Sequence, residues 1–301
     1  MKAREWTMFG VLGLIWGSSF LWIKIAVADV GPLTLVGWRL LFGLAGLAVV
    51  VALRRPHFPG DARTWGAMVL LGLTNTALPF ALISWGETSI DSAVASILNG
   101  TVPLFAMVIA HFALHDDRIT VPRVVGLVTG FIGVVALMAR DIGPQGVQQG
   151  LLGQAAVLLA AVFYAGSSVF ARRTLRGVSP VVQAFVPLIG ADTFIWVAAL
   201  SAESSKLVPA QGQTWLALAW LGILGSCIAY LLYFGLIQSV GPTRATVVTY
   251  VFPVVGVILG VLFLHEMVDQ HLVIGAGLIV AGIVAVNWKP RAAPVPAAAG
   301  E

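Results

Sequence analysis

Ten long apolar runs fill almost the whole chain, and they limit the folds that are open to it. The runs cover residues 6–28, 32–53, 64–85, 90–114, 120–139, 150–170, 180–200, 212–236, 243–265 and 268–288. A helix needs about 20 mostly apolar residues to cross a bilayer. Charged residues make up only 10% of the chain, against roughly 25% in a soluble protein. The sequence predicts an all-α integral membrane protein with ten transmembrane helices, and it excludes a soluble enzyme.

Neither a β-barrel nor a metal site fits the pattern. Strands that cross a membrane alternate polar and apolar residues over about ten positions, and this alternation is absent from the sequence. Cys227 is the single cysteine, and no zinc or calcium spacing of ligand residues occurs. We therefore expect no disulfide, no metal and no cofactor.

Lys and Arg residues fall mostly on one side of the predicted membrane. If the N-terminus is cytoplasmic and successive helices alternate in direction, 13 of the 17 Lys and Arg residues are cytoplasmic. Arg140 and Lys206 lie on the outer side, and Lys24 and Arg39 lie within helices. Cytoplasmic loops carry an excess of Lys and Arg, so we expect a multi-pass inner-membrane protein with both termini in the cytoplasm. This asymmetry accounts for the pI near 9.6, and no nucleic-acid partner is expected.

The chain also repeats itself at an offset of 149 to 150 residues. The matches run from the first to the fifth apolar run and again from the sixth to the tenth. Among them, Gly17-Ser18-Ser19 falls on Gly166-Ser167-Ser168, Trp65 on Trp215, Gly72 on Gly222, Pro103 on Pro253, Gly126 on Gly275 and Gly133 on Gly282. The predicted units are residues 6–140 and 150–288, followed by a disordered cytoplasmic tail at 289–301.

Because five is odd, the second unit must enter the membrane in the opposite orientation to the first. Inverted repeats are the architecture of transporters that open a central site alternately to the two sides of the membrane. The predicted fold is therefore two inverted five-helix repeats around a central cavity, and the predicted function is transport by alternating access.

Several short stretches resemble the drug/metabolite transporter superfamily, in its ten-helix group with two EamA domains. They are Trp16-Gly17-Ser18-Ser19-Phe20 with Lys24, Pro32 with Arg39, Leu78-Pro79-Phe80, and the segment from Pro103 to His115-Asp116. Within the superfamily the chain is most similar to YddG-type amino-acid exporters, while sibling proteins move nucleosides, sugars, drugs or other metabolites. The family usually carries Glu at the end of the fourth helix, where this chain has Asp116, with Glu266 in the second repeat.

Prolines interrupt four of the predicted helices. Pro103 and Pro253 occupy equivalent positions, and Pro79 and Pro187 are further breaks. Proline removes one backbone hydrogen bond from a helix. We interpret Pro103, Pro187 and Pro253 as hinges that let the helix ends rock, with kinks fixed by packing as the alternative. Pro79 is placed with the residues that line the site.

Aromatic and amide side chains gather near the middle of the predicted membrane. Tyrosines in membrane proteins normally lie at the interfaces, and deeper hydroxyl groups need partners, which a polar cavity provides. Such a lining suits a small amphipathic ligand such as an amino acid. The candidate substrate-binding residues of this kind are Trp16, Asn75, Asn99, Tyr164, Ser168, Tyr230 and Tyr250.

Ionisable residues inside the helices are few, and each is a candidate for function. Arg39 can attract a substrate carboxylate or cap a backbone carbonyl, and Lys24 can do the same or extend to the interface. Asp192 can receive an ammonium group, pair with Arg39 or carry a coupling proton. Arg39 and Asp192 complete the predicted binding site.

Two other classes fit the sequence less well than a transporter. An intramembrane enzyme with Ser18 or Ser168 as nucleophile lacks a neighbouring base, and a channel calls for rings of like charge or a filter sequence. No nucleotide-binding loop occurs. We expect a monomeric, secondary or facilitative exporter of neutral and aromatic amino acids, with export of drugs or of nucleoside- or sugar-like metabolites as the alternative.

Overall fold

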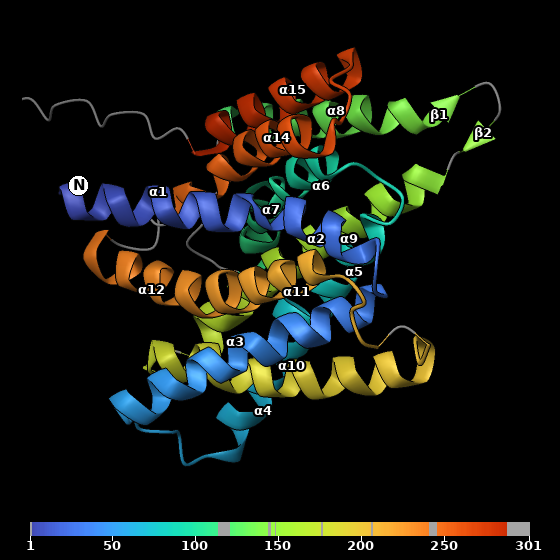
Figure 1. Ribbon diagram of the computed structural model, residues 1–301. Helices are drawn as coiled ribbons and strands as arrows, with labels where there is room; N and C mark the ends of the chain where they lie inside the picture. Colours follow the sequence, from blue (N-terminus) through green and yellow to red (C-terminus); the bar gives the residue numbers. More distant parts are fainter. Residues whose placement is uncertain are drawn as a thin grey trace, which may run out of the picture.

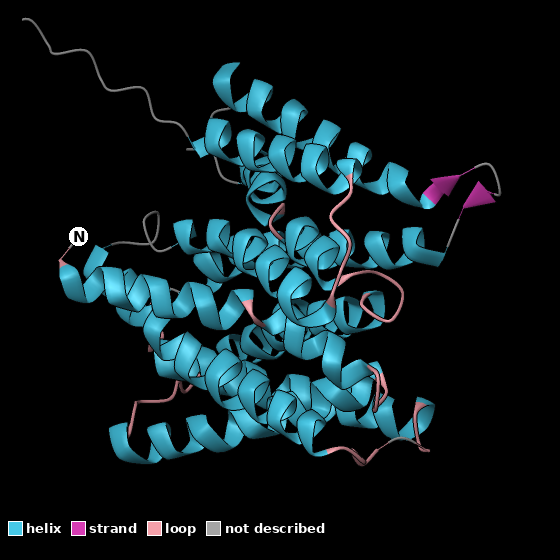
Figure 2. Ribbon diagram, turned by 45° about the horizontal axis from the view of Figure 1, so that its top comes forward, coloured by secondary structure: helices cyan, strands magenta, loops and turns pink. Residues whose placement is uncertain are grey.

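The computed structural model describes residues 2–113, 121–143, 146–147, 149–175, 177–205, 207–240 and 246–287. Helices account for nearly all of the regular structure in these ranges (Figure 2). Two short antiparallel strands, β1 (Ile142–Gly143) and β2 (Gly146–Val147), join the two repeats. The predicted tail at 289–301 and the segment with Asp116 lie outside the described residues.

The helices follow the predicted order of ten spans. The first repeat contains α1 (Ala3–Gly17), α2 (Ser19–Val27), α3 (Pro32–Arg54), α4 (Ala62–Gly72), η1 (Leu73–Ala77), α5 (Leu78–Gly86), α6 (Ser92–Asn99), α7 (Val102–Ala113), α8 (Val121–Met138) and η2 (Ala139–Asp141). The second contains α9 (Gln149–Thr174), α10 (Pro180–Ala202), α11 (Gly212–Ala219), η3 (Trp220–Ile228), α12 (Ala229–Val240), η4 (Thr246–Tyr250), α14 (Val251–Leu264) and α15 (Gln270–Asn287). Among the described residues, eight spans are long and apolar enough to cross a membrane, and the apolar helices Val248–Leu264 and Gln270–Val286 are shorter. The predicted all-α membrane fold is confirmed.

Helices of the first repeat pack against helices of the second. Each of these contacts has an equivalent when the two repeats are exchanged. α8 packs along α15 at one edge of the bundle, and α3 packs along α10 toward the opposite edge (Figure 1). α5 packs on α9, and α1 packs on α12, which is the same pairing with the repeats exchanged. Two copies of one unit in opposite orientations produce this exchange symmetry.

Glycines show the same symmetry in the contact between α8 and α15. A Cβ on Gly126 would lie 2.7 Å from the carbonyl oxygen of Gly282, and a Cβ on Gly133 would lie 2.8 Å from that of Gly275. The repeat equates Gly126 with Gly275 and Gly133 with Gly282, so each contact becomes the other when the repeats are exchanged. Small residues let helix backbones approach closely inside a membrane, and here they hold the fifth span against the tenth.

We expect Gly282→Ala to destabilise the protein and Gly277→Ala, on the same helix, to leave it unchanged or slightly more stable. A Cβ on Gly282 would lie 2.5 Å from the Gly126 carbonyl oxygen, whereas a Cβ on Gly277 would meet nothing within 4 Å. Overpacking of this kind costs roughly 1–3 kcal/mol, while Ala is favoured over Gly in a helix by up to about 1 kcal/mol. Thermal unfolding of both purified variants in detergent measures the difference, and equal midpoints would contradict the packing described.

A π-helical segment occurs at equivalent places in the third and eighth spans. The segments are η1 and η3, and an offset of 150 residues places η1 inside η3. In the first repeat, Pro79 is the second residue of α5, the helix that directly follows η1, and it cannot donate a backbone hydrogen bond. π-helical turns are rare in proteins, and those that do occur often lie at functional sites. Here they carry Thr76 and Ser226, which the repeat also equates.

Candidate functional site

Arg39 is the eighth residue of α3 and is buried, with 5% of its surface exposed. Its guanidinium carbon lies 3.7 Å from the centre of the Phe80 ring of α5. Its Nε donates a hydrogen bond to Ser226 Oγ of η3 at 3.3 Å. Within the described part of the chain, no carboxylate forms an ion pair with it. A buried cation without an anionic partner is costly inside a membrane, so this position is suited to an anionic group from outside the chain.

Tyrosines complete the polar surroundings of Arg39. Tyr164 of α9 and Tyr230 of α12 both interact electrostatically with the guanidinium. Tyr230 also shares a hydrogen bond with the side chain of Thr76. Phe80 and Tyr230 are equated by the repeat at an offset of 150 residues, as are Thr76 and Ser226. Arg39 is therefore surrounded by symmetry-related pairs, which places it at the junction between the two repeats.

Trp16 of α1 joins this group through aromatic contacts. Its ring centroid lies 6.1 Å from Tyr230, 5.3 Å from Tyr233 and 5.7 Å from Phe252. Its Nε1 donates to the carbonyl oxygen of Gly225 at 3.0 Å. Of the predicted binding residues, Trp16, Arg39, Tyr164 and Tyr230 thus belong to one cluster. We call these four, with Thr76, Phe80 and Ser226, the Arg39 cluster.

The other predicted binding residues are more widely spread. Asn75 is half-buried in η1, and Pro79 is buried beside it. Asn99 ends α6, and its buried Oδ1 has no hydrogen-bond partner among the described residues. Tyr250 ends η4, half-buried against the main hydrophobic core.

Ser168 and Asp192 differ from the cluster in their surroundings. Ser168 is exposed on α9, and its hydroxyl donates to the Ala165 carbonyl oxygen at 2.7 Å. Asp192 is half-buried on α10 near Trp196 of the same helix, and its buried Oδ1 has no hydrogen-bond partner among the described residues. The ion pairs of the described residues do not include one between Asp192 and Arg39.

Two of the three predicted hinge prolines lie next to a helix interruption, whereas the helix around Pro187 is not broken as the sequence predicted. Pro103 is the second residue of α7, directly after the break that separates α6 from α7. Pro253 lies in the first turn of α14, after the 3-10 helix η4. Pro187 lies inside the continuous helix α10. The fourth and ninth spans are therefore interrupted at equivalent places, just before the equivalent prolines.

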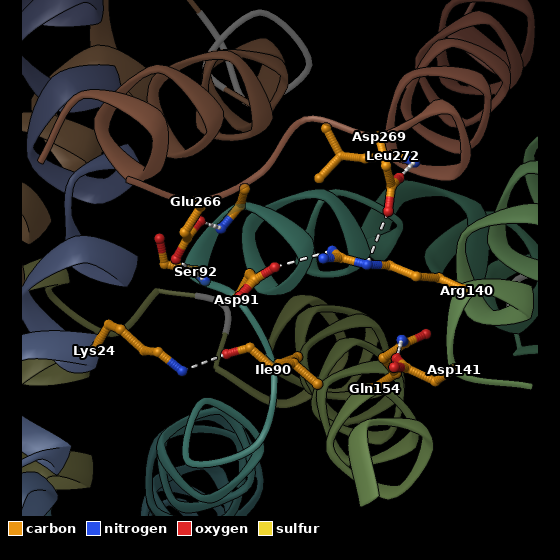
Figure 3. A network of polar contacts seen from close by, with 11 residues as sticks. Lys24, Ile90, Asp91, Ser92, Arg140, Asp141, Gln154, Glu266, Asp269 and Leu272 are labelled. Atoms are coloured by element: carbon orange, nitrogen blue, oxygen red, sulfur yellow. Dashed lines mark hydrogen bonds and ion pairs between the residues drawn. The ribbon is translucent and has the colours of Figure 1, made fainter. Parts of the chain in front are cut away.

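A second group of polar residues lies at the end of the bundle where α2, α5, α10 and α14 finish. We call it the Lys24 end; the predicted topology makes it the outer end. Lys24 Nζ donates to the carbonyl oxygens of Glu87 and Ile90, both at 2.7 Å. Figure 3 shows the contact with Ile90. These carbonyls belong to the loop between α5 and α6, so Lys24 fixes this loop against α2.

Carboxylates from the second repeat hold the first repeat at the same end. Glu266 accepts hydrogen bonds from the backbone N–H groups of Ser92 at 2.7 Å and Ala93 at 2.9 Å. Figure 3 shows Glu266 beside Ser92. The first N–H groups of a helix lack partners within it, and its N-terminus favours negative charge, so Glu266 caps α6. Glu203 caps α3 in the same way, through Leu33 N–H at 3.1 Å and Thr34 N–H at 2.8 Å.

Arg140 adds an ion-pair network at this end. It pairs with Asp91, which precedes α6, and with Asp269, which precedes α15, each at 2.9 Å (Figure 3). The Lys24 end is therefore closed by contacts that join the two repeats.

Thr76, Phe80 and Ser226 of the Arg39 cluster and Glu87 of the Lys24 end were not predicted as site residues from the sequence. Ser226 and Phe80 touch Arg39, and the equivalence of Phe80 with the predicted Tyr230 was a signal that could have identified Phe80. Glu87 follows the third span, where the sequence pattern predicts a solvent-exposed loop residue, yet it is fully buried. Its burial has no signal in the local sequence.

Comparison with known proteins agrees with this arrangement. The model of the EamA-like transporter family matches residues 6–139 and 151–288. The "Uncharacterized transporter YoaV" of Bacillus subtilis is 26% identical over 284 residues, covering 92% of this chain and 94% of the relative. The "Uncharacterized inner membrane transporter YedA" of Escherichia coli is 28% identical over 301 residues, covering 96% and 95%.

A solved structure, described only as the crystal structure of a protein, has a TM-score of 0.67 at 22% identity. It covers 95% of this chain and 96% of that chain. Similarity at this level of identity shows the fold alone. The family match spans both five-helix repeats. The chain belongs to the EamA-like transporter family, with one EamA domain in each repeat.

Proposed function

We propose that this transporter exports neutral amino acids, aromatic ones included, from the cytoplasm across the inner membrane by alternating access. The observation that carries the proposal is the buried guanidinium of Arg39, which has an aromatic ring on one face and no carboxylate partner within the described residues. A substrate carboxylate would supply the missing charge. The rings of Trp16, Phe80 and Tyr230 would contact an apolar or aromatic side chain.

The symmetry of the Arg39 cluster supports its role as the central site. Alternating access needs a site that both halves can reach as they rock, and the pairs Phe80/Tyr230 and Thr76/Ser226 come from both repeats. Arg39 is buried in this conformation, so substrate would enter after the helices move. Pro103 and Pro253, at the interruptions of the fourth and ninth spans, are the proposed hinges, with Pro187 as a third.

The topology and the family support the remaining parts of the proposal. A relative is named as an inner membrane transporter, and the Lys and Arg distribution favours cytoplasmic termini. With these termini the Lys24 end faces outward. We propose that the protein acts as a monomer and as a facilitative or secondary carrier, and that Asn75, Pro79, Asn99, Ser168, Asp192 and Tyr250 contribute to the pathway. The resemblance to YddG-type exporters favours amino acids over other substrates.

Flux in proteoliposomes tests this proposal. The panel is labelled tryptophan, phenylalanine, threonine, lysine and a sugar, with and without an imposed pH gradient. Competition by tryptamine and by indole-3-propionate then identifies which group of tryptophan is recognised. We expect tryptophan, phenylalanine and threonine to be transported, and we expect indole-3-propionate to compete better than tryptamine because it keeps the carboxylate.

Other outcomes would redirect the assignment. Equal flux of tryptophan, threonine and the sugar would contradict selection by the Arg39 cluster. Strong competition by tryptamine with none by indole-3-propionate would contradict carboxylate recognition. Absence of amino-acid flux would move the substrate class to drugs or to nucleoside- or sugar-like metabolites.

A further inference from the structure

Glu87 is a buried acid at the Lys24 end. It follows the span that ends at Gly86, and none of its surface is exposed. Neither of its carboxylate oxygens has a hydrogen-bond partner among the described residues. Other acids at this end are satisfied, since Glu203 and Glu266 each accept two backbone hydrogen bonds. An ionised carboxylate without donors is strongly disfavoured in a buried position.

The charged groups that face Glu87 do not supply the missing partner. In the described part of the chain they are Lys24 from α2, Arg39 from α3 and Glu266 from the segment after α14. The Lys24 ammonium is occupied by two backbone carbonyls, one of which belongs to Glu87 itself. α9 also packs on α5, and its charged residues, Arg172 and Arg173, lie at its opposite end. Burial raises the pKa of Glu87 well above its usual range, and Lys24 opposes this only in part.

We propose that Glu87 is a proton-binding site whose occupancy is coupled to opening of the Lys24 end. With this end closed, Glu87 is held in its protonated, neutral form. Opening separates the loop between α5 and α6 from α2, so Lys24 loses its two carbonyl acceptors. Lys24 can then pair with the carboxylate of Glu87, and the proton passes to water on that side of the membrane.

The direction of the pH effect follows from this cycle. A raised pKa in the closed state means that closure is favoured at low pH and is lost as the pH rises through that value. The site is present in one repeat only, because an offset of 150 residues equates Glu87 with the apolar Ile237. Proton binding therefore favours closure of the Lys24 end and has no equivalent site at the other end.

Labelling of a single cysteine tests the proposal without any substrate, so its result is independent of the proposed amino-acid export. Cys227, the only cysteine, is replaced by Ala, and Ser92→Cys introduces a thiol at a fully buried position of the Lys24 end. The protein in nanodiscs is labelled with a polar maleimide between pH 5.5 and 8.5. Gln213→Cys, at an exposed position near the same end, reports the intrinsic pH dependence of thiol reaction.

We expect labelling at position 92, divided by that at position 213, to rise at least tenfold with pH. Glu87→Gln should mimic the protonated side chain and hold the ratio low across the range, whereas Glu87→Asp should keep a pH dependence. Glu203→Gln, a change to a hydrogen-bonded acid at the same end, should leave the rise in place. A ratio that does not change with pH, or one that rises equally with Glu87→Gln, would overturn the proposal.

Discussion

Replacing Arg39 by Gln should lower amino-acid transport by at least about 30-fold while leaving the protein folded. Loss of one partner from a buried charge pair costs about 2–5 kcal/mol, and each 1.4 kcal/mol is about a factor of ten. The lost pair is the one with the substrate carboxylate, because the guanidinium has no carboxylate partner in the described chain. Exchange flux of labelled tryptophan in proteoliposomes measures the effect.

Thermal stability distinguishes this role from a structural one. If Arg39 serves the substrate, removing an uncompensated buried charge should leave the unfolding midpoint unchanged or raise it. A structural cation would instead lower it on removal. Arg39→Lys keeps the charge but loses the planar group that lies on Phe80, so partial flux is expected. Full flux with Arg39→Gln would contradict carboxylate binding at this residue.

Glu266→Gln should open the Lys24 end. The carboxylate accepts two backbone hydrogen bonds from the start of α6, and a hydrogen bond to a charged group is worth about 1.5–3 kcal/mol. The amide keeps one acceptor but loses the second acceptor and the charge. The ratio of closed to open molecules should fall by a factor of about 10 to 100. Maleimide labelling of Ser92→Cys at fixed pH measures the change.

Glu203→Gln is the matched control for this variant. It removes one hydrogen-bond acceptor and the negative charge from the start of α3. However, α3 and α10 pack along each other, and we expect them to move together. Its labelling at position 92 should stay close to that of the parent. If both variants raise labelling equally, Glu266 has no specific role in closing this end.

The spans and their inverted repeat could be predicted because both are one-dimensional properties of the chain. Apolar length decides where a helix crosses, and the offset of 150 residues is visible without knowing any contact. Trp16, Arg39, Tyr164 and Tyr230 were also predicted, because polar or aromatic groups deep in a span require partners. The structure brings these four into one cluster.

The rest depended on how the helices come together. Thr76 and Ser226 look like ordinary hydroxyl residues in apolar runs, and in the structure they reach the cluster from the two π-helical segments. Glu87 looks like a solvated loop residue, because nothing near it in sequence shows that Lys24 holds its backbone inside the bundle. Cross-repeat caps such as Glu266 join residues 174 positions apart, and no local pattern reveals them.

The capping of α3 and α6 by Glu203 and Glu266 also determines when the first repeat can complete its fold during synthesis. Each cap is translated about 170 residues after the helix start that it serves, which takes roughly 10–30 s at ordinary ribosome speeds. During that interval the first five helices lie in the membrane with N–H groups at two helix starts still lacking their carboxylate partners. The amino-terminal half therefore completes its fold only when the carboxyl-terminal half arrives, and a pause in translation between residues 92 and 266 prolongs its most vulnerable state.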